Sequence, residues 1–249
     1  MAKMLQKNNY GWLPDIPDKR DYLYRTIKPR LKLPKIADIT RYCSTIENQG
    51  TLGSCTANAL AGNIEFLDNR WDGEYTDASR LFIYFNERVI IGSQDYDSGA
   101  SLRDGIKTLK NIGYCWEKDW PYKIKLFDQK PPESCYKEAL EHLIVSYHRI
   151  SGLNEMLICL SEGYPFVFGF TVYESFEDDQ VSRSGIVNMP DKDERALGGH
   201  AVMAVGYNQK EKRFLVRNSW GVKWGRKGYF TMPFEYLETL AADFWTIRK

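Results

Sequence analysis

Residues 49–58 decide the fold of this chain, and they read Gln49-Gly50-Thr51-Leu52-Gly53-Ser54-Cys55-Thr56-Ala57-Asn58. A glycine-rich loop runs here into residues 57–67, whose apolar side chains recur at helical spacing. Cys55 therefore lies at the start of a predicted helix. Unpaired backbone N–H groups and the positive end of the helix dipole favour a thiolate there. We expect the pKa of Cys55 to lie far below the value of about 8.5 of a free thiol, which makes Cys55 the candidate nucleophile.

A general base of the histidine type has three candidates in this sequence. His142 lies on a polar helical face, and His148 has no glycine-rich setting. His200 stands in Gly198-Gly199-His200-Ala201-Val202, where the glycines leave room for the backbone of a substrate to approach. His200 is therefore the candidate base, and Gly198 and Gly199 are candidate substrate-binding residues.

Two amide side chains complete a candidate catalytic group. Asn218 precedes Ser-Trp-Gly, and its amide can accept a hydrogen bond from an imidazole and fix the orientation of the ring. Trp220 would cover that bond and exclude water from it. Gln49, six residues before Cys55, can point its NH₂ group at a substrate carbonyl and form an oxyanion hole with the Cys55 backbone N–H. The order cysteine, histidine, asparagine is that of a cysteine-peptidase triad.

Composition excludes several other classes of protein. The chain has 249 residues, enough for one large domain or two packed lobes, and a net charge of +1 gives no electrostatic footprint for nucleic acid. No apolar run approaches the roughly 18 residues of a membrane span, and the N-terminus has no apolar signal-peptide core. The five cysteines are scattered, so we expect no metal site and a reducing, cytoplasmic or otherwise intracellular setting.

The order of predicted elements indicates the fold class. Helical patterns dominate the first half of the chain, and runs rich in β-branched and aromatic residues dominate the second, which is typical of an α+β fold with two lobes and a site between them. Residues 1–32 carry prolines and no clear period, and we expect an extended arm. Helices are predicted over residues 57–67, 77–88, 101–112 (closed by Gly113) and 133–147. Residues 153–162 are predicted to be an approach segment that leads from the first half of the chain into the second. Strands are predicted over residues 166–172, 200–207, 213–218 and 229–232.

The chain resembles the papain-like cysteine peptidases, the family of papain and the cathepsins. Gln49, Cys55, His200 and Asn218 fall on the oxyanion glutamine, nucleophile, base and orienting asparagine of that family, and the block from Asn218 to Tyr229 is highly specific to it. The likeness covers roughly residues 33–249. It implies a helical lobe over about 50–130, a β-rich lobe over about 131–249, and peptide hydrolysis through an acyl-thioester without any cofactor. The family type expected is a non-secreted microbial or viral one, with a virion as a further possible location.

Three departures from the family pattern stand out. Thr56 replaces the tryptophan after the nucleophile, Leu52 replaces a disulfide cysteine, and a substrate-strand glycine pair is reduced to Ser98-Gly99. The resemblance also places the second substrate subsite near Ala242 and Asp243. An inward Asp243 would favour basic substrates, and an inward Ala242 would favour apolar ones. The candidate substrate-binding residues are Gly53, Ser98, Gly99, Gly198, Gly199, Trp220, Ala242 and Asp243.

Two alternatives to a peptidase stay open at this point. The same triad can serve an amidase or acyltransferase acting on a non-protein substrate, and the fold can persist as a catalytically silent binding module. The expected partner is a polypeptide substrate, with no nucleic acid and no membrane. Residues 1–32 are much shorter than the propeptide typical of the family, so we expect the arm either to occupy the cleft and inhibit or to strap the outside of a lobe.

Overall fold

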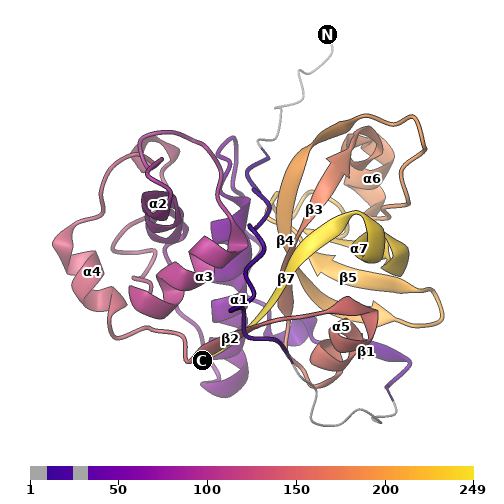
Figure 1. Cartoon of the computed structure of the whole chain (residues 1–249), viewed down its shortest axis with the longest axis horizontal. Helices are drawn as coiled ribbons and strands as arrows, with labels where there is room; N and C mark the ends of the chain where they lie inside the picture. The colour runs from indigo at the N-terminus through magenta and orange to yellow at the C-terminus, as the bar shows by residue number, and fades with distance from the viewer. Residues whose placement is uncertain (1–9, 25–32) are drawn as a thin grey trace.

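The computed structural model describes residues 10–24 and 33–249, and these form two lobes (Figure 1). One lobe is helical, and the other is built on a seven-stranded antiparallel sheet. The two-lobed α+β fold expected from the sequence is therefore confirmed. The helical segments are η1 (Thr40–Tyr42), α1 (Cys55–Trp71), α2 (Arg80–Ile90), α3 (Leu102–Asn111), η2 (Ile124–Leu126), α4 (Glu133–Ala139), α5 (Gly152–Ser161), η3 (Glu174–Glu177), α6 (Asp179–Ser184) and α7 (Phe234–Thr239).

The helices of the first lobe begin and end at residues with clear local reasons. Ser79 caps α2 by accepting a hydrogen bond from the Phe82 N–H, and Ser101 caps α3 in the same way. Gly113, just after α3, has a positive φ of 87°, a conformation that glycine adopts without steric cost. α1 is buried along most of its length because it packs between the two lobes and against β4.

The sheet of the second lobe runs in the order β2-β7-β3-β4-β5-β6, with β1 paired to β4. The long central strand β4 carries His200 opposite Phe170 of β3, and its next residue, Ala201, lies opposite Gly169. The strands are β1 (Ile36–Asp38), β2 (Ser146–Arg149), β3 (Phe166–Tyr173), β4 (Ala196–Asn208), β5 (Arg213–Arg217), β6 (Tyr229–Pro233) and β7 (Ala241–Arg248).

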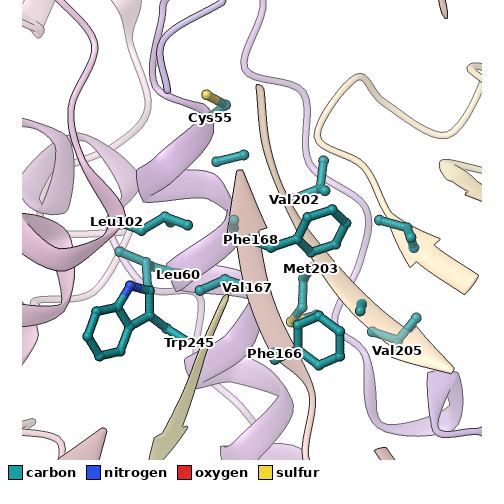
Figure 2. Packing of buried hydrophobic residues seen from close by; sticks show 14 of the residues in the cluster. Cys55, Leu60, Leu102, Phe166, Val167, Phe168, Val202, Met203, Val205 and Trp245 are labelled. Atoms are coloured by element: carbon teal, nitrogen blue, oxygen red, sulfur yellow. The ribbon is translucent and has the colours of Figure 1, made fainter. Parts of the chain in front are cut away.

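A continuous apolar core joins the lobes beneath Cys55 (Figure 2). Leu60 of α1 and Leu102 of α3 meet Trp245 of β7 there, and all three side chains are fully buried. Because dense packing resists deformation, this core holds the start of α1 in a fixed position relative to β4.

The predicted helix over residues 133–147 is wrong in its second half. α4 ends at Ala139, and residues 146–149 form the edge strand β2, which pairs with β7. The hydrogen-bonding partner that β7 offers lies about a hundred residues away, so local patterning did not reveal it. Ala139 belongs to the same buried cluster as Phe82 of α2. Within the described residues, no helix is long and apolar enough to cross a membrane.

Candidate active site

Cys55 opens α1 and is fully buried. Its sulfur accepts hydrogen bonds from the backbone N–H groups of Ala201 and Gly11. Burial is the largest effect on the thiol, and it raises the pKa of Cys55 to about 11. The expectation of a strongly lowered pKa is therefore wrong for this structure. The reason is that the thiol is fully buried, and this desolvation outweighs the hydrogen bonds from Ala201 and Gly11, which by themselves lower the pKa.

His200 is held by Asn218 and covered by Trp220. The Nε2–H of His200 donates to Asn218 Oδ1 at 2.8 Å, and the Ser219 N–H donates to the same oxygen at 2.8 Å. With its proton on Nε2, the neutral ring leaves Nδ1 unprotonated, and Nδ1 is buried with no hydrogen-bond partner among the described residues. The indole of Trp220 stacks on the imidazole at 4.9 Å between ring centroids. This leaves Nδ1 as the basic nitrogen of the ring.

Burial disfavours the charged forms of both the thiol and the imidazole. Burial lowers the pKa of His200 to about 4, while the Asn218 bond opposes this shift only in part. Since the pKa of Cys55 is raised, the charged thiolate–imidazolium pair is disfavoured on both sides. Burial therefore acts against the charged form of each member of the pair.

Gln49 lies in the loop before Cys55 and is fully buried. Its Oε1 accepts a hydrogen bond from the Ser219 hydroxyl at 2.7 Å, and its Nε2 donates to the Leu52 carbonyl oxygen at 2.9 Å. Behind it, the Tyr122 hydroxyl donates to the Gln49 carbonyl oxygen at 2.9 Å. The amide of Gln49 is therefore fixed with its nitrogen turned toward the loop that leads to Cys55.

Residues 10–13 of the N-terminal arm belong to the indigo segment that runs between the two lobes in Figure 1, and Gly11 contacts the Cys55 sulfur. The Ala100 N–H donates to the Gly11 carbonyl oxygen at 2.8 Å, and the Leu13 N–H donates to the Ala100 carbonyl oxygen at 2.9 Å. On the other lobe, the Trp12 N–H donates to the Gly199 carbonyl oxygen at 3.0 Å. The arm is thus bound by backbone hydrogen bonds to both lobes, as an added strand is.

Glycines on both sides make room for the arm. A Cβ added at Gly169 would lie 1.9 Å from the Trp12 indole, and one added at Gly199 would lie 2.6 Å from it. A Cβ at Gly11 itself would lie 1.7 Å from the Gly53 carbonyl oxygen. These approaches are possible only without side chains, so Trp12 lies in a pocket that Gly169 and Gly199 open.

Tyr10 also packs beside the histidine. Its ring centroid lies 6.4 Å from that of His200 and 6.3 Å from that of Trp220, and its hydroxyl donates to Glu177. Gly198 touches the Tyr10 Cβ region, where an added Cβ would lie 2.8 Å away. Tyr10 therefore packs beside His200, while Trp12 packs against the neighbouring strands at Gly169 and Gly199.

Among the expected substrate-binding residues, the four glycines approach the arm, whereas Ser98 has a different partner. Gly53, Gly99, Gly198 and Gly199 all approach the arm backbone or its side chains closely, and a Cβ at Gly99 would lie 2.2 Å from the Gly11 carbonyl oxygen. The Ser98 hydroxyl instead pairs with the Ser93 hydroxyl at 2.7 Å.

Ala242 and Asp243 lie on β7, beside the pocket of Trp12. Ala242 pairs with Gly169 of β3. Asp243 is buried and adopts a positive φ of 58°. Its two carboxylate oxygens accept hydrogen bonds from Arg149 at 2.9 Å and from the Asp15 N–H at 2.7 Å. Burial raises the pKa of Asp243 to about 6, even though Arg149 opposes this shift.

Three residues at the site were missed by sequence reasoning. Ala100 supplies both backbone bonds to the arm on the helical lobe, Gly169 opens the pocket of Trp12, and the Ala201 N–H contacts the Cys55 sulfur. Gly169 carried a signal, because a single glycine inside a strand of large residues often marks a close backbone approach. Ala100 and Ala201 carried none, since their contribution is made by backbone atoms.

The described residues hold no group of three or more histidine, cysteine, aspartate or glutamate side chains that could bind a metal ion.

Comparison with known proteins gives a consistent result. Residues 33–237 match the family described as papain family cysteine protease. A peptidase C1-like protein of Acanthamoeba polyphaga mimivirus is 44% identical over 97% of this chain and 87% of its own length. The crystal structure of xylellain, a cysteine protease from Xylella fastidiosa, has a TM-score of 0.90 and 41% identity, covering 100% of this chain and 99% of that one. A digestive procathepsin L 3 of Tenebrio molitor shares the fold at a TM-score of 0.71 and 17% identity, over 92% of this chain and 75% of that one.

Proposed function

This chain belongs to the papain family of cysteine proteases, and we propose that Cys55 is its nucleophile and His200 its general base and acid. One observation carries the assignment. The bond from His200 Nε2 to Asn218 leaves Nδ1 as the basic nitrogen, while the Cys55 sulfur contacts the N–H of the next residue, Ala201. The chemistry is peptide hydrolysis, and neither a silent module nor a non-protein amidase is favoured.

The mechanism follows from these positions. His200 Nδ1 accepts the thiol proton, and the Cys55 sulfur attacks the carbonyl carbon of the scissile bond. Gln49 Nε2 and the Cys55 backbone N–H stabilise the oxyanion. The imidazolium then protonates the leaving amine, and an acyl-thioester remains on Cys55. His200 next removes a proton from water, which hydrolyses the thioester and restores the thiol.

Substitutions separate these roles. We expect Cys55→Ala to abolish turnover of an internally quenched peptide, and His200→Ala to lower kcat/KM more than Asn218→Ala, because Asn218 orients the ring and does not carry the proton. Equal losses for His200→Ala and Asn218→Ala would contradict the orienting role. Digestion of a peptide library beside a panel of small non-peptide amides tests the substrate class.

We infer in addition that residues 10–13 hold the enzyme latent. The arm crosses the nucleophile, and the Gly11 carbonyl oxygen accepts a hydrogen bond from the Ala100 N–H of the helical lobe. Tethering of the arm to its own enzyme gives it an effective concentration on the order of millimolar. In the intact protein, the arm therefore occupies the active site until residues 10–13 are displaced or removed.

A single methyl group tests the latent state. Gly11→Ala places a Cβ where it would lie 1.7 Å from the Gly53 carbonyl oxygen, so this part of the arm must move away from Gly53. We expect faster peptide cleavage and faster alkylation of Cys55 by iodoacetamide than in wild type. Ile16→Ala, on an exposed side chain of the same arm, is the matched control and should change neither rate. Unchanged rates in Gly11→Ala would refute latency while leaving the catalytic assignments standing.

The pocket filled by Trp12 is proposed as an apolar substrate subsite. The carboxylate of Asp243 is already bound by Arg149 and the arm backbone, so it is not poised to select a basic side chain. The Trp12 Nε1–H is buried and has no hydrogen-bond partner among the residues that the structure describes, and such an orphan donor costs about 1–3 kcal/mol. We therefore expect phenylalanine or leucine to be preferred over lysine, arginine and tryptophan in a substrate panel, and Asp243→Asn to create no loss of basic-residue cleavage. A strong arginine preference that Asp243→Asn removes would overturn the proposal.

The cellular location of the protein stays a prediction. We propose an intracellular enzyme, or one carried in a virion, and fractionation of cells that produce the natural protein would test this.

A further inference from the structure

A second, smaller cluster of buried side chains lies in the helical lobe, away from Cys55. It consists of Phe82, Cys115, Cys135 and Ala139. Cys115 lies just after α3, and Cys135 lies in α4. The Cys115 thiol donates a hydrogen bond to the Cys135 sulfur, and both residues are at most 1% exposed. Two thiols from separate segments are thus in direct contact inside an apolar environment.

The three other cysteines have different surroundings. Cys43 interacts with Tyr229 and Arg217. The Cys159 thiol donates to the Tyr164 carbonyl oxygen at 3.4 Å. Cys55 contacts backbone N–H groups at the active site. Among the five cysteines, all of them in the described residues, the contact of Cys115 with Cys135 is therefore the one suited to a cross-link.

We propose that Cys115 and Cys135 form a structural disulfide when the protein meets a small-molecule disulfide as oxidant. The thiolate of one cysteine attacks the oxidant, releases one small thiol and forms a mixed disulfide. The second cysteine attacks that bond and releases the second small thiol. Two S–H bonds are lost and one S–S bond is formed, while the oxidant is reduced to two thiols. To reach an S–S bond length of about 2.05 Å, the two sulfur atoms must move closer together than they are in a hydrogen bond.

The bond would brace the segment that supports the active site. Between the two cysteines, the Trp120 carbonyl oxygen accepts a hydrogen bond from the Ser79 hydroxyl at 2.6 Å. Tyr122 contacts the Gln49 carbonyl oxygen and, at 2.5 Å, the Ser54 hydroxyl. Closing this loop restricts the unfolded chain, so we expect the oxidised protein to have a Tm roughly 5–10 °C higher than the reduced protein.

The experiment maps the cysteines of the full-length protein. One sample is incubated folded with oxidised glutathione, and a second is refolded in a glutathione redox buffer, so that access of the oxidant to buried thiols does not decide the result. After denaturation and alkylation, peptide mass mapping should find Cys115 joined to Cys135, with a mass lower by two hydrogen atoms. Dithiothreitol should reverse both the cross-link and the gain in Tm.

Two variants serve as controls for this experiment. Cys115→Ala should remove the oxidant-dependent gain in Tm, and Cys159→Ala, at another buried cysteine, should retain it. The proposal is overturned if Cys115 and Cys135 are both alkylated in both samples, if they carry separate glutathione adducts, or if either one is linked to Cys43 instead.

Discussion

At the scale of single residues, Ser219 links the two amides of the site. Its backbone N–H holds Asn218 Oδ1, the atom that orients His200, and its hydroxyl holds Gln49 Oε1. One residue therefore fixes both the orientation of the base and that of the proposed oxyanion donor. A hydrogen bond made by the backbone survives any side-chain substitution, so the two effects can be separated experimentally.

Substitution at Gln49 and Ser219 tests this link. We expect Gln49→Ala to lower kcat by about 10²–10³, the loss typical of one oxyanion donor. Ser219→Ala should lower kcat by less, because Gln49 keeps its bond to the Leu52 carbonyl oxygen, and it should leave the pH dependence set by His200 unchanged. Steady-state kinetics of both variants measure this. Full activity of Gln49→Ala would move the oxyanion role to another group.

A buried carboxyl behind the nucleophile gives a pH-dependent prediction. Glu87 accepts a hydrogen bond from the Thr56 hydroxyl at 2.6 Å, and its other oxygen is buried with no partner in the described part of the chain. Burial raises the pKa of Glu87 to about 8. In the unfolded chain this carboxyl ionises above about pH 4.5, while in the folded protein it stays neutral up to about pH 8. Folding therefore loses stability as pH rises through this window.

Glu87→Gln should remove that loss, because an amide keeps an acceptor for Thr56 and never ionises. We expect it to stabilise the protein by roughly 2–4 kcal/mol at pH 8 and by close to zero at pH 4. Urea unfolding at the two pH values provides the measurement. The same difference at both pH values would mean that ionisation of Glu87 is not the cause.

At this scale, the sequence could predict those site residues whose neighbours along the chain reveal their role. Cys55 and Gln49 lie in one short run, and His200 and Asn218 each have a distinctive local setting. The pKa of Cys55 was predicted wrongly because the folded chain buries the thiol completely, and no local pattern reveals that burial.

At the scale of elements, the strands β3 and β4 followed from their runs of β-branched and aromatic residues, and α1 to α3 from their helical spacing. The edge strands β1 and β2 did not, because each is only a few residues long and depends on a distant partner strand. The same limit applies to the arm, whose backbone bonds at Ala100 and Gly199 are independent of side-chain identity.

The glycine in β3 controls what its pocket accepts. In Gly169→Ala the new Cβ would lie 1.9 Å from the Trp12 indole, so the indole can no longer lie flat against the strand. We expect faster trypsin cleavage at Lys19 and Arg20 of the loosened arm, and a substrate preference shifted from phenylalanine toward smaller side chains. Thr171→Ser on the same strand is the control. An unchanged preference would show that the Trp12 pocket is not the substrate subsite.

At the scale of the whole molecule, the arm also ties the lobes together behind the site. Asp21 is ion-paired with Arg103 of α3 at 2.5 Å and with Arg149 of β2 at 3.0 Å, so one carboxylate joins a helix of one lobe to a strand of the other. Asp15 adds bonds to the Arg103 N–H at 3.1 Å and to Trp245 Nε1 at 2.8 Å. The arm is therefore both a cover over Cys55 and a strap between the lobes, in consecutive segments.

Stepwise truncation separates the cover from the strap. Removal of residues 1–13 takes away the contacts with Cys55, His200 and the Trp12 pocket but leaves Asp15 and Asp21 in place. We expect peptidase activity to rise while Tm changes little. Removal of residues 1–24 also leaves Arg103, Arg149 and Asp243 without their arm partners, and loss of one side of a buried charge pair is strongly destabilising. The longer deletion should therefore lower Tm by roughly 5–10 °C at the same initial activity. Asp21→Asn in the full chain is the matched test of the strap, because it should lower Tm without raising activity. If the shorter deletion destabilised the protein as much as the longer one, or if neither raised activity, the division of the arm into two working segments would be refuted.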